Sequence, residues 1–111
     1  MKKYVRLFNE GIRIKKEPSL DDEFIQLQVY LKDKADKTAD NFADAIIAWA
    51  KKKKIVYAMD TKVNQPYDLD TFLYDDTKNK NYTLAKVDIK REYAKDLEKW
   101  LRTSGSSFLK K

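Results

Sequence analysis

The sequence predicts an α+β fold, a single small domain in which a sheet and helices share one hydrophobic core. The chain has 111 residues, which is the size of one domain. Hydrophobic residues make up 42% and aromatic residues 13%, so there is enough apolar surface for a packed interior. Segments with the strand period of two also occur beside segments with the helical period of 3.6. We expect this domain at residues 1–103 and a flexible C-terminal tail at residues 104–111.

The first expected element is an N-terminal β-hairpin between Lys3 and Lys16. Apolar and polar residues alternate on both sides of the short turn Asn9–Gly11, which is the pattern of two strands joined by a tight connection. Pro18 ends the second strand, because proline interrupts the hydrogen bonding of a sheet.

Residues 20–34 are predicted to form the first of two consecutive helices. Ser19 is a suitable N-cap, Pro18 comes directly before it, and Asp21 starts an acidic first turn. Apolar residues then recur at helical spacing, at Leu20, Phe24, Leu27 and Leu31. A strand is the alternative, because apolar residues also alternate with polar ones at Ile25, Leu27, Val29 and Leu31.

The second helix is expected from about Thr38 to Lys53, with Asp36 or Thr38 as its cap. Its inward-facing residues would be Phe42, Ala45, Ile46 and Trp49. Directly after it, the apolar run Ile55–Met59 predicts a buried strand.

A second hairpin and a third helix complete the expected order. Phe72–Tyr74 and Tyr82–Leu84 flank a polar, turn-rich tip. The third helix is expected from about Asp88 to Arg102, with Ile89, Tyr93, Leu97, Trp100 and Leu101 on its apolar side. Two helices followed by a hairpin resemble the arrangement of winged helix-turn-helix proteins, so the order is compatible with a variant of that fold.

The composition excludes several classes of function. The chain contains no Cys and no His, which rules out a disulfide scaffold, a Cys/His zinc site and a Ser–His–Asp triad. Gly11 and Gly105 are the only glycines, so a glycine-rich phosphate loop cannot form. No apolar run has the length of a signal peptide or a membrane span, and we therefore expect a cytoplasmic protein. We expect no cofactor.

Carboxylates are the remaining candidates for catalysis. Asp68 and Asp70 are two residues apart, so a strand would place them on one side, and Asp75 and Asp76 follow closely. Acidic clusters can hold Mg²⁺ for phosphoryl transfer. The spacing nevertheless lacks the glycine and the terminal glutamate of a calcium-binding loop. We interpret these residues as solvated loop residues and expect no enzyme activity, with a Mg²⁺-dependent enzyme as the third hypothesis.

The formal net charge is +6, and the basic residues concentrate in three features. Lys51–Lys54 ends the second helix and wraps more than one turn, so it forms a collar. The third helix carries a basic ridge with spacings of four, four and three, where Glu98 could pair with Lys95 or Arg102. The tip of the second hairpin carries two further lysines. The candidate nucleic-acid-binding residues are therefore Lys51, Lys52, Lys53, Lys54, Lys78, Lys80, Arg91, Lys95, Lys99 and Arg102.

Each feature alone is explained more simply by a solvated surface, and lysines at a helix end also match the helix dipole. Their combination favours an accessory protein that binds nucleic acid, with DNA preferred, by docking basic helix faces and a basic hairpin tip on phosphates. Size and Lys/Asn/Tyr-rich composition suggest a plasmid, a phage or another mobile element. A homodimer would supply enough contact area.

Two alternatives remain open. A non-enzymatic protein-binding module, such as an inhibitor or an assembly factor, fits a surface with 38% charged residues of both signs. Tyrosines on predicted strands could also stack on unpaired bases, although packing is the simpler explanation for them. These tyrosines are Tyr4, Tyr57, Tyr74 and Tyr82.

Overall fold

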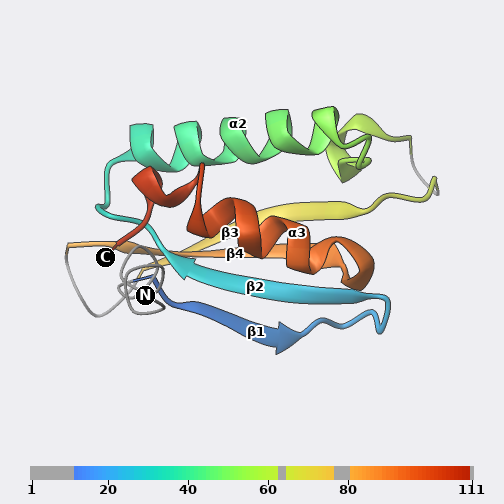
Figure 1. Cartoon of the computed structure of the whole chain (residues 1–111), viewed down its shortest axis with the longest axis horizontal. Helices are drawn as coiled ribbons and strands as arrows, with labels where there is room; N and C mark the ends of the chain where they lie inside the picture. The colour runs from blue at the N-terminus through green and yellow to red at the C-terminus, as the bar shows by residue number, and fades with distance from the viewer. Residues whose placement is uncertain (1–11, 63–64, 77–80, 111) are drawn as a thin grey trace, which may run out of the picture.

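A four-stranded antiparallel sheet carries two helices on one of its faces (Figure 1). The computed structural model describes residues 12–62, 65–76 and 81–110, and it confirms the α+β class. The elements in chain order are β1 (Ile14–Pro18), β2 (Phe24–Tyr30), α2 (Asp36–Lys52), the 3₁₀ helix η1 (Ala58–Asp60), β3 (Leu69–Asp76), β4 (Thr83–Lys90), α3 (Arg91–Arg102) and the 3₁₀ helix η2 (Ser106–Phe108).

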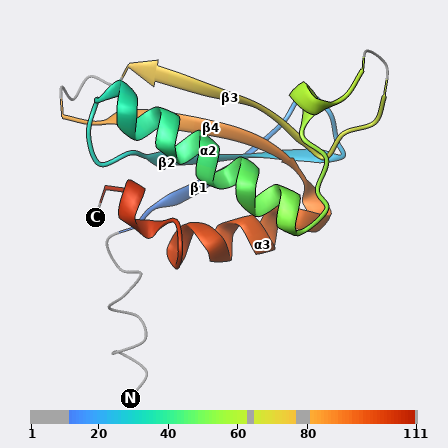
Figure 2. The ribbon, with the colours of Figure 1, turned by 90° about the horizontal axis from the view of Figure 1, so that it is seen from above.

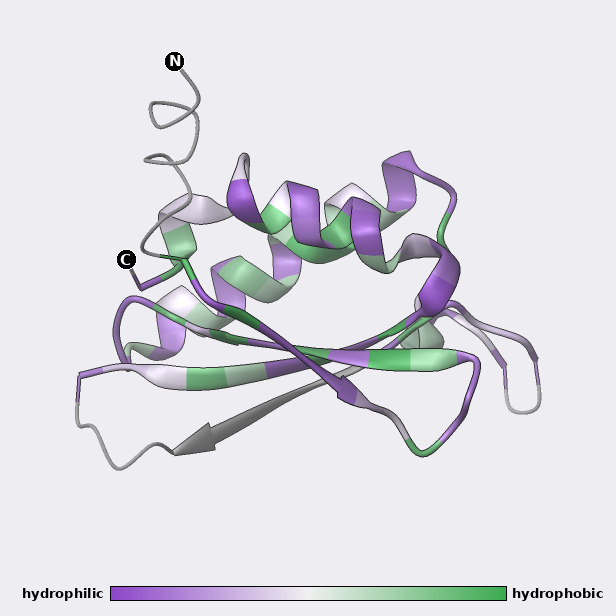
Figure 3. Cartoon of the chain, turned by 60° about the horizontal axis from the view of Figure 1, so that its bottom comes forward, coloured by the Kyte–Doolittle hydropathy of each residue, from purple (hydrophilic) through white to green (hydrophobic). Residues whose placement is uncertain are grey.

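The strand order is β1-β2-β4-β3, so β2 and β4 are the central strands. Leu27 of β2 is paired with Val87 of β4, and both side chains are buried. Side chains alternate between the two faces of a strand, and Figure 3 shows the resulting changes of hydropathy along β2 and β4. Five apolar residues of these strands therefore share the face that α2 and α3 cover (Figures 1 and 2): Leu27, Val29, Ala85, Val87 and Ile89.

The hydrophobic core lies between this sheet face and the two helices. Phe42 and Ile46 of α2 are fully buried, as the helical spacing predicts. Leu97 and Leu101 of α3 are also buried against the sheet. The other face of the sheet carries no helix in the part of the chain that the structure describes, and we call it the uncovered face in this sense.

The prediction of a helix over residues 20–34 is wrong, because residues 24–30 form the central strand β2. The acidic residues that suggested a helix start form the β1–β2 turn instead. There, the Glu23 N–H donates to Asp21 Oδ1 (2.9 Å) and the Phe24 N–H donates to the Asp21 carbonyl (3.0 Å). Since α2 is the only α-helix before the β3–β4 hairpin in the described residues, the pair of helices on which the comparison with a winged helix-turn-helix rested is not found there.

The remaining boundaries also differ in places from the expected ones. Ile55–Met59 is not a full strand, since Tyr57 forms one parallel bridge with Leu69 and η1 follows. The helix α3 starts at Arg91 and not at Asp88, because Ile89 belongs to β4. β1 confirms the end of a strand at Pro18, although its partner here is β2. The other half of the expected N-terminal hairpin lies outside the described residues.

Neither Asp36 nor Thr38 is the N-cap of α2. The helix is preceded by Ala35, which makes no capping bond through its side chain. Asp33 organises this helix start, since its Oδ1 accepts the Ala35 N–H (2.9 Å) and Thr38 donates to its carboxylate. Both hydrogen bonds lower the pKa of Asp33, and the one from Thr38 has the larger effect.

Residues 104–110 pack on the domain and do not extend from it as the expected tail. Leu109 is only 3% exposed and bridges to Leu31 beside the end of β2. Phe108 packs edge-to-face on Phe42 of α2, with the ring centroids 6.0 Å apart. Gly105 sits so close to α3 that an added Cβ would lie 2.5 Å from Cζ3 of Trp100. Leu109 and Phe108 therefore complete the core. In the sequence they stand among Ser and Lys residues, which suggested a solvated tail.

Candidate nucleic-acid interface

The C-terminus of α2 presents four consecutive exposed lysines, Lys51–Lys54. It has the hydrogen bonding of a Schellman motif. The Lys54 N–H donates to the Lys51 carbonyl (3.2 Å) and the Ile55 N–H donates to the Ala50 carbonyl (2.9 Å). This geometry requires a left-handed residue after the cap, and Lys54 adopts it with φ 60°. Glycine is the usual residue there, because a side chain in this conformation is strained.

The end of α2 packs beside α3. The Trp49 and Trp100 ring centroids are 6.3 Å apart, and Lys53 Nζ lies 3.9 Å from Asp96 Oδ2. A shallow surface hollow of about 230 Å³ lies at this contact, with Lys53 and Lys99 both in its lining. The fold therefore brings the collar of α2 together with the exposed side of α3.

We refer to six exposed lysines at this junction as the lysine cluster. Lys95 and Lys99 are one turn apart on α3, and both are exposed. Among the described residues, the only ion pair of the cluster is the one between Lys53 and Asp96. This pair is long and half-exposed, so it neutralises Lys53 weakly. The cluster consists of Lys51, Lys52, Lys53, Lys54, Lys95 and Lys99.

Glu98 does not reduce the charge of the cluster as the sequence suggested. Its Oε1 pairs with Lys16 Nζ of β1 at 3.3 Å, on the flank of α3 that faces the sheet edge. Glu92 is the other exposed carboxylate on the outer side of α3, besides Asp96. Six lysines and these two carboxylates leave the junction positively charged.

The two arginines of the predicted ridge make bonds within the fold. Arg91 Nε donates to the Asp22 carbonyl in the β1–β2 turn (2.7 Å). Arg102 Nη1 donates to the Ile12 carbonyl, just before β1 (3.0 Å). Both contacts lie on the β1 side of α3, whereas α2 packs on its other flank through Trp100. The predicted ridge is therefore divided between two flanks, and only its lysines join the collar.

The third basic feature, Lys78 and Lys80, lies outside the described residues. The strand ends that flank it, at Asp76 of β3 and Thr83 of β4, lie at the end of the sheet near the start of α2. Thr83 accepts the Leu31 N–H there (2.8 Å), just before that helix begins. The lysine cluster is at the opposite end of α2.

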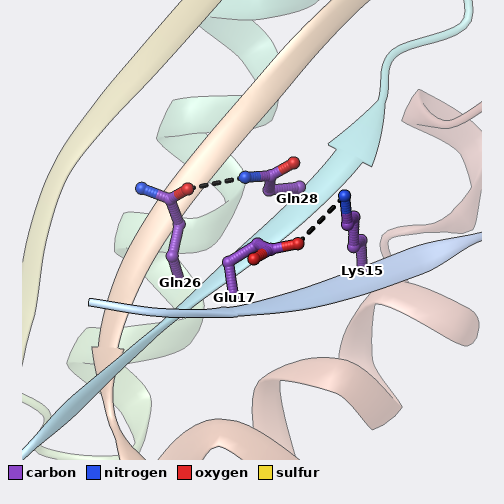
Figure 4. A network of polar contacts seen from close by, with 4 residues as sticks. All are labelled: Lys15, Glu17, Gln26 and Gln28. Carbon is purple, nitrogen blue, oxygen red and sulfur yellow. Dashed lines mark hydrogen bonds and ion pairs between the residues drawn. The ribbon is translucent and has the colours of Figure 1, made fainter. Parts of the chain in front are cut away.

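The uncovered face of the sheet carries a second set of polar and aromatic residues. Lys15 Nζ pairs with Glu17 Oε1 at 2.9 Å, and Gln28 Nε2 donates to Gln26 Oε1 at 2.7 Å (Figure 4). Tyr30 is 39% exposed, although a helix over residues 20–34 gave no reason to expect a binding role for it. In the strand interpretation, Tyr30 lies between the apolar residues Val29 and Leu31 and therefore points to the opposite face. The helix interpretation does not predict this orientation.

Asp88 of β4 is an ionisable group of this face with an incompletely satisfied carboxylate. Its Oδ1 is buried and has no hydrogen-bond partner among the described residues. Burial raises the pKa of Asp88, and the negative charge of Asp70 raises it further, while hydrogen bonds from Gln26 and Ser19 oppose the shift.

Asp68 and Asp70, which were considered as Mg²⁺ ligands, make polar contacts within the fold. Asp68 Oδ2 accepts the Val56 N–H (3.0 Å) and Asp68 Oδ1 pairs with Lys90 Nζ (3.5 Å). Asp70 Oδ2 accepts the hydroxyl of Tyr67 (3.3 Å). Over residues 12–62, 65–76 and 81–110 there is no group of three or more potential metal ligands.

Comparison with known proteins found no matching family model, no matching curated protein and no matching solved structure. In the described part of the chain, neither helix combines the length and the apolar character that crossing a membrane requires.

Proposed function

We propose that the protein is a small cytoplasmic DNA-binding accessory protein that docks on the phosphate backbone of a duplex through the lysine cluster. The observation that carries the proposal is the junction of the two helices, where Lys53 and Lys99 line the same hollow. Lysines from two elements can there contact one backbone, and phosphate contacts supply most of the affinity in sequence-independent binding.

Lys54 gives independent support. Its backbone is in the left-handed region at φ 60°, where glycine would cost less. Its side chain is exposed and makes no ion pair with the described residues. The helix end requires the left-handed conformation but not a side chain, and local strain of this kind is a basis for a functional hypothesis. We attribute the lysine at this position to its charge.

The salt dependence of binding tests the electrostatic mechanism. If all six lysines of the cluster neutralise phosphates, the logarithm of the binding constant should fall against the logarithm of salt concentration with a slope of roughly −5. Fluorescence anisotropy with a labelled duplex at several salt concentrations measures this slope. No duplex binding at low salt would refute the proposal and favour the protein-binding module. Salt-insensitive binding would refute the mechanism.

Single substitutions test whether both helices contribute. Lys52→Gln in α2 and Lys99→Gln in α3 should each weaken duplex binding and reduce the slope by about 1. Lys37→Gln is the matched control, because Lys37 is exposed on the first turn of α2, far from the cluster. An equal loss in the control and the two cluster variants would mean that only the net charge matters. Sedimentation velocity with and without duplex measures whether a homodimer binds.

A further inference from the structure

The uncovered sheet face has an aromatic and basic half. Tyr30 and Tyr82 pack edge-to-face with ring centroids 5.1 Å apart. Lys110 Nζ lies 5.0 Å from the Tyr82 ring, and the Lys110 N–H donates to the Tyr30 carbonyl (2.9 Å). The C-terminal segment therefore holds a cation beside the two rings. We call Tyr30, Tyr82 and Lys110 the tyrosine platform.

Further cations flank the tyrosine platform. Lys15 of β1 and Lys86 of β4 are both register partners of Gln28, which lies two residues before Tyr30 on the same face. The charge of Lys15 is also close enough to Tyr30 for the two side chains to interact electrostatically. The side-chain amide of Gln28 lies in this row, and its hydrogen bond to Gln26 links it to the next row.

The other half of this face is acidic. Glu17, Gln26 and Asp88 share one register row, and the charge of Asp70 acts on Asp88. In the strand order, the backbone position of Asp75 lies beside Leu84 at the platform end. A polyanion on this face would therefore be confined to a short stretch across the tyrosine platform.

We infer that the tyrosine platform binds an unpaired segment of nucleic acid, with a base stacked on Tyr30 and the adjoining phosphates near Lys110, Lys15 and Lys86. Aromatic rings with lysines beside them on a sheet face suit this ligand. Every base has a flat face that can stack on a ring, and every phosphate has a negative charge that a lysine can contact. Amide groups beside the rings can bond to base edges. This inference goes beyond the proposed function, since the platform belongs to the sheet and the lysine cluster to the helices.

The test uses the full chain and a fluorescein-labelled oligothymidylate of about 12 nucleotides, read by fluorescence anisotropy at low salt. We expect the wild type to bind it. Tyr30→Ala should weaken binding by about tenfold or more, and Tyr30→Phe, which keeps the ring, should stay within about twofold of the wild type. Tyr82→Ala provides a second variant. Circular dichroism and urea midpoints confirm that each variant is folded.

Two results would overturn the inference. One is an oligothymidylate affinity that Tyr30→Ala and Tyr82→Ala leave unchanged, which includes the case in which the wild type does not bind at all. The other is a dimer that Tyr30→Ala converts to a monomer without a change in affinity, which would make this face a contact between copies. Lys52→Gln and Lys99→Gln separate the two proposals, because they should reduce duplex binding and leave the effect of Tyr30→Ala in place. Duplex binding that survives them refutes only the lysine cluster.

Discussion

Replacing Lys54 by glycine should stabilise the protein. A residue with a side chain in the left-handed conformation costs about 1–2 kcal/mol, and Lys54 has φ 60°. Glycine removes this cost but loses about 0.5–1 kcal/mol more backbone entropy on folding. The net gain should be about 1 kcal/mol, which corresponds to a rise in Tm of about 4 °C for a domain of this size. Thermal and urea denaturation measure it.

The matched control makes the same chemical change three residues earlier. Lys51 lies inside α2, so Lys51→Gly should destabilise by up to about 1 kcal/mol. Opposite signs for the two Lys→Gly variants would assign the effect to backbone conformation and not to lost charge. If Lys54→Gly is no more stable than the wild type, the helix end is not strained and the support that Lys54 gives to the proposed function is lost. If the proposal holds, the same variant binds duplex more weakly although it is more stable.

Two other predictions concern the sheet and the C-terminal segment. Asp88→Asn should stabilise the protein at neutral pH by about 1 kcal/mol, because it removes a partly buried negative charge that lies near Asp70. The pKa of Asp88 is raised in the folded state, so its ionisation disfavours folding above that pKa. The advantage of the variant should therefore shrink as pH falls towards the unfolded value of about 4, and urea titrations across pH measure this. Leu109→Ala should destabilise by about 3 kcal/mol if the segment completes the core, whereas a change within about 0.5 kcal/mol would indicate a loose tail.

The parts of the fold that the sequence predicted are those with one dominant periodicity. Phe42, Ile46 and Trp49 form a stripe that only a helix explains, and α2 is found within two residues of its predicted bounds. The hairpin of β3 and β4 is also confirmed, because two β-rich segments flank a polar turn. These signals are local, so a single sequence contains them.

The errors occurred where one sequence fits two local patterns. Ile89 continues the helical stripe of α3 but equally continues the alternation of Ala85 and Val87, and pairing with Ile25 decides for the strand. For residues 24–30, the acidic turn at Asp21 resembled a helix start. These residues form a strand and not a helix, because the backbone N–H and C=O groups of β2 are paired with β1 on one side and with β4 on the other. The pairing of β2 with β4 joins residues about 60 apart, so no local window of the sequence shows it.

The candidate site was predictable in its residues but not in its arrangement. Exposure of Lys51–Lys54 follows from their position after the apolar stripe of α2. Their meeting with Lys99 depends on the packing of Trp49 against Trp100, which no spacing in the sequence specifies. The left-handed conformation of Lys54 was also unpredictable, because the usual glycine is absent.

The arginines of α3 make hydrogen bonds within the fold, whereas the lysines of the cluster are exposed, and this difference makes the proposed interface testable. Arg91 and Arg102 donate to backbone carbonyls of Asp22 and Ile12, so they tie α3 to the β1 side of the sheet. Removing either guanidinium leaves a carbonyl without its donor and should lower stability as well as charge. The lysines of the cluster lie on the outer side, where a flexible ammonium group remains hydrated. Neutralising them therefore changes the charge of the surface with little effect on the fold, and a loss of duplex binding in those variants reports on the interface itself.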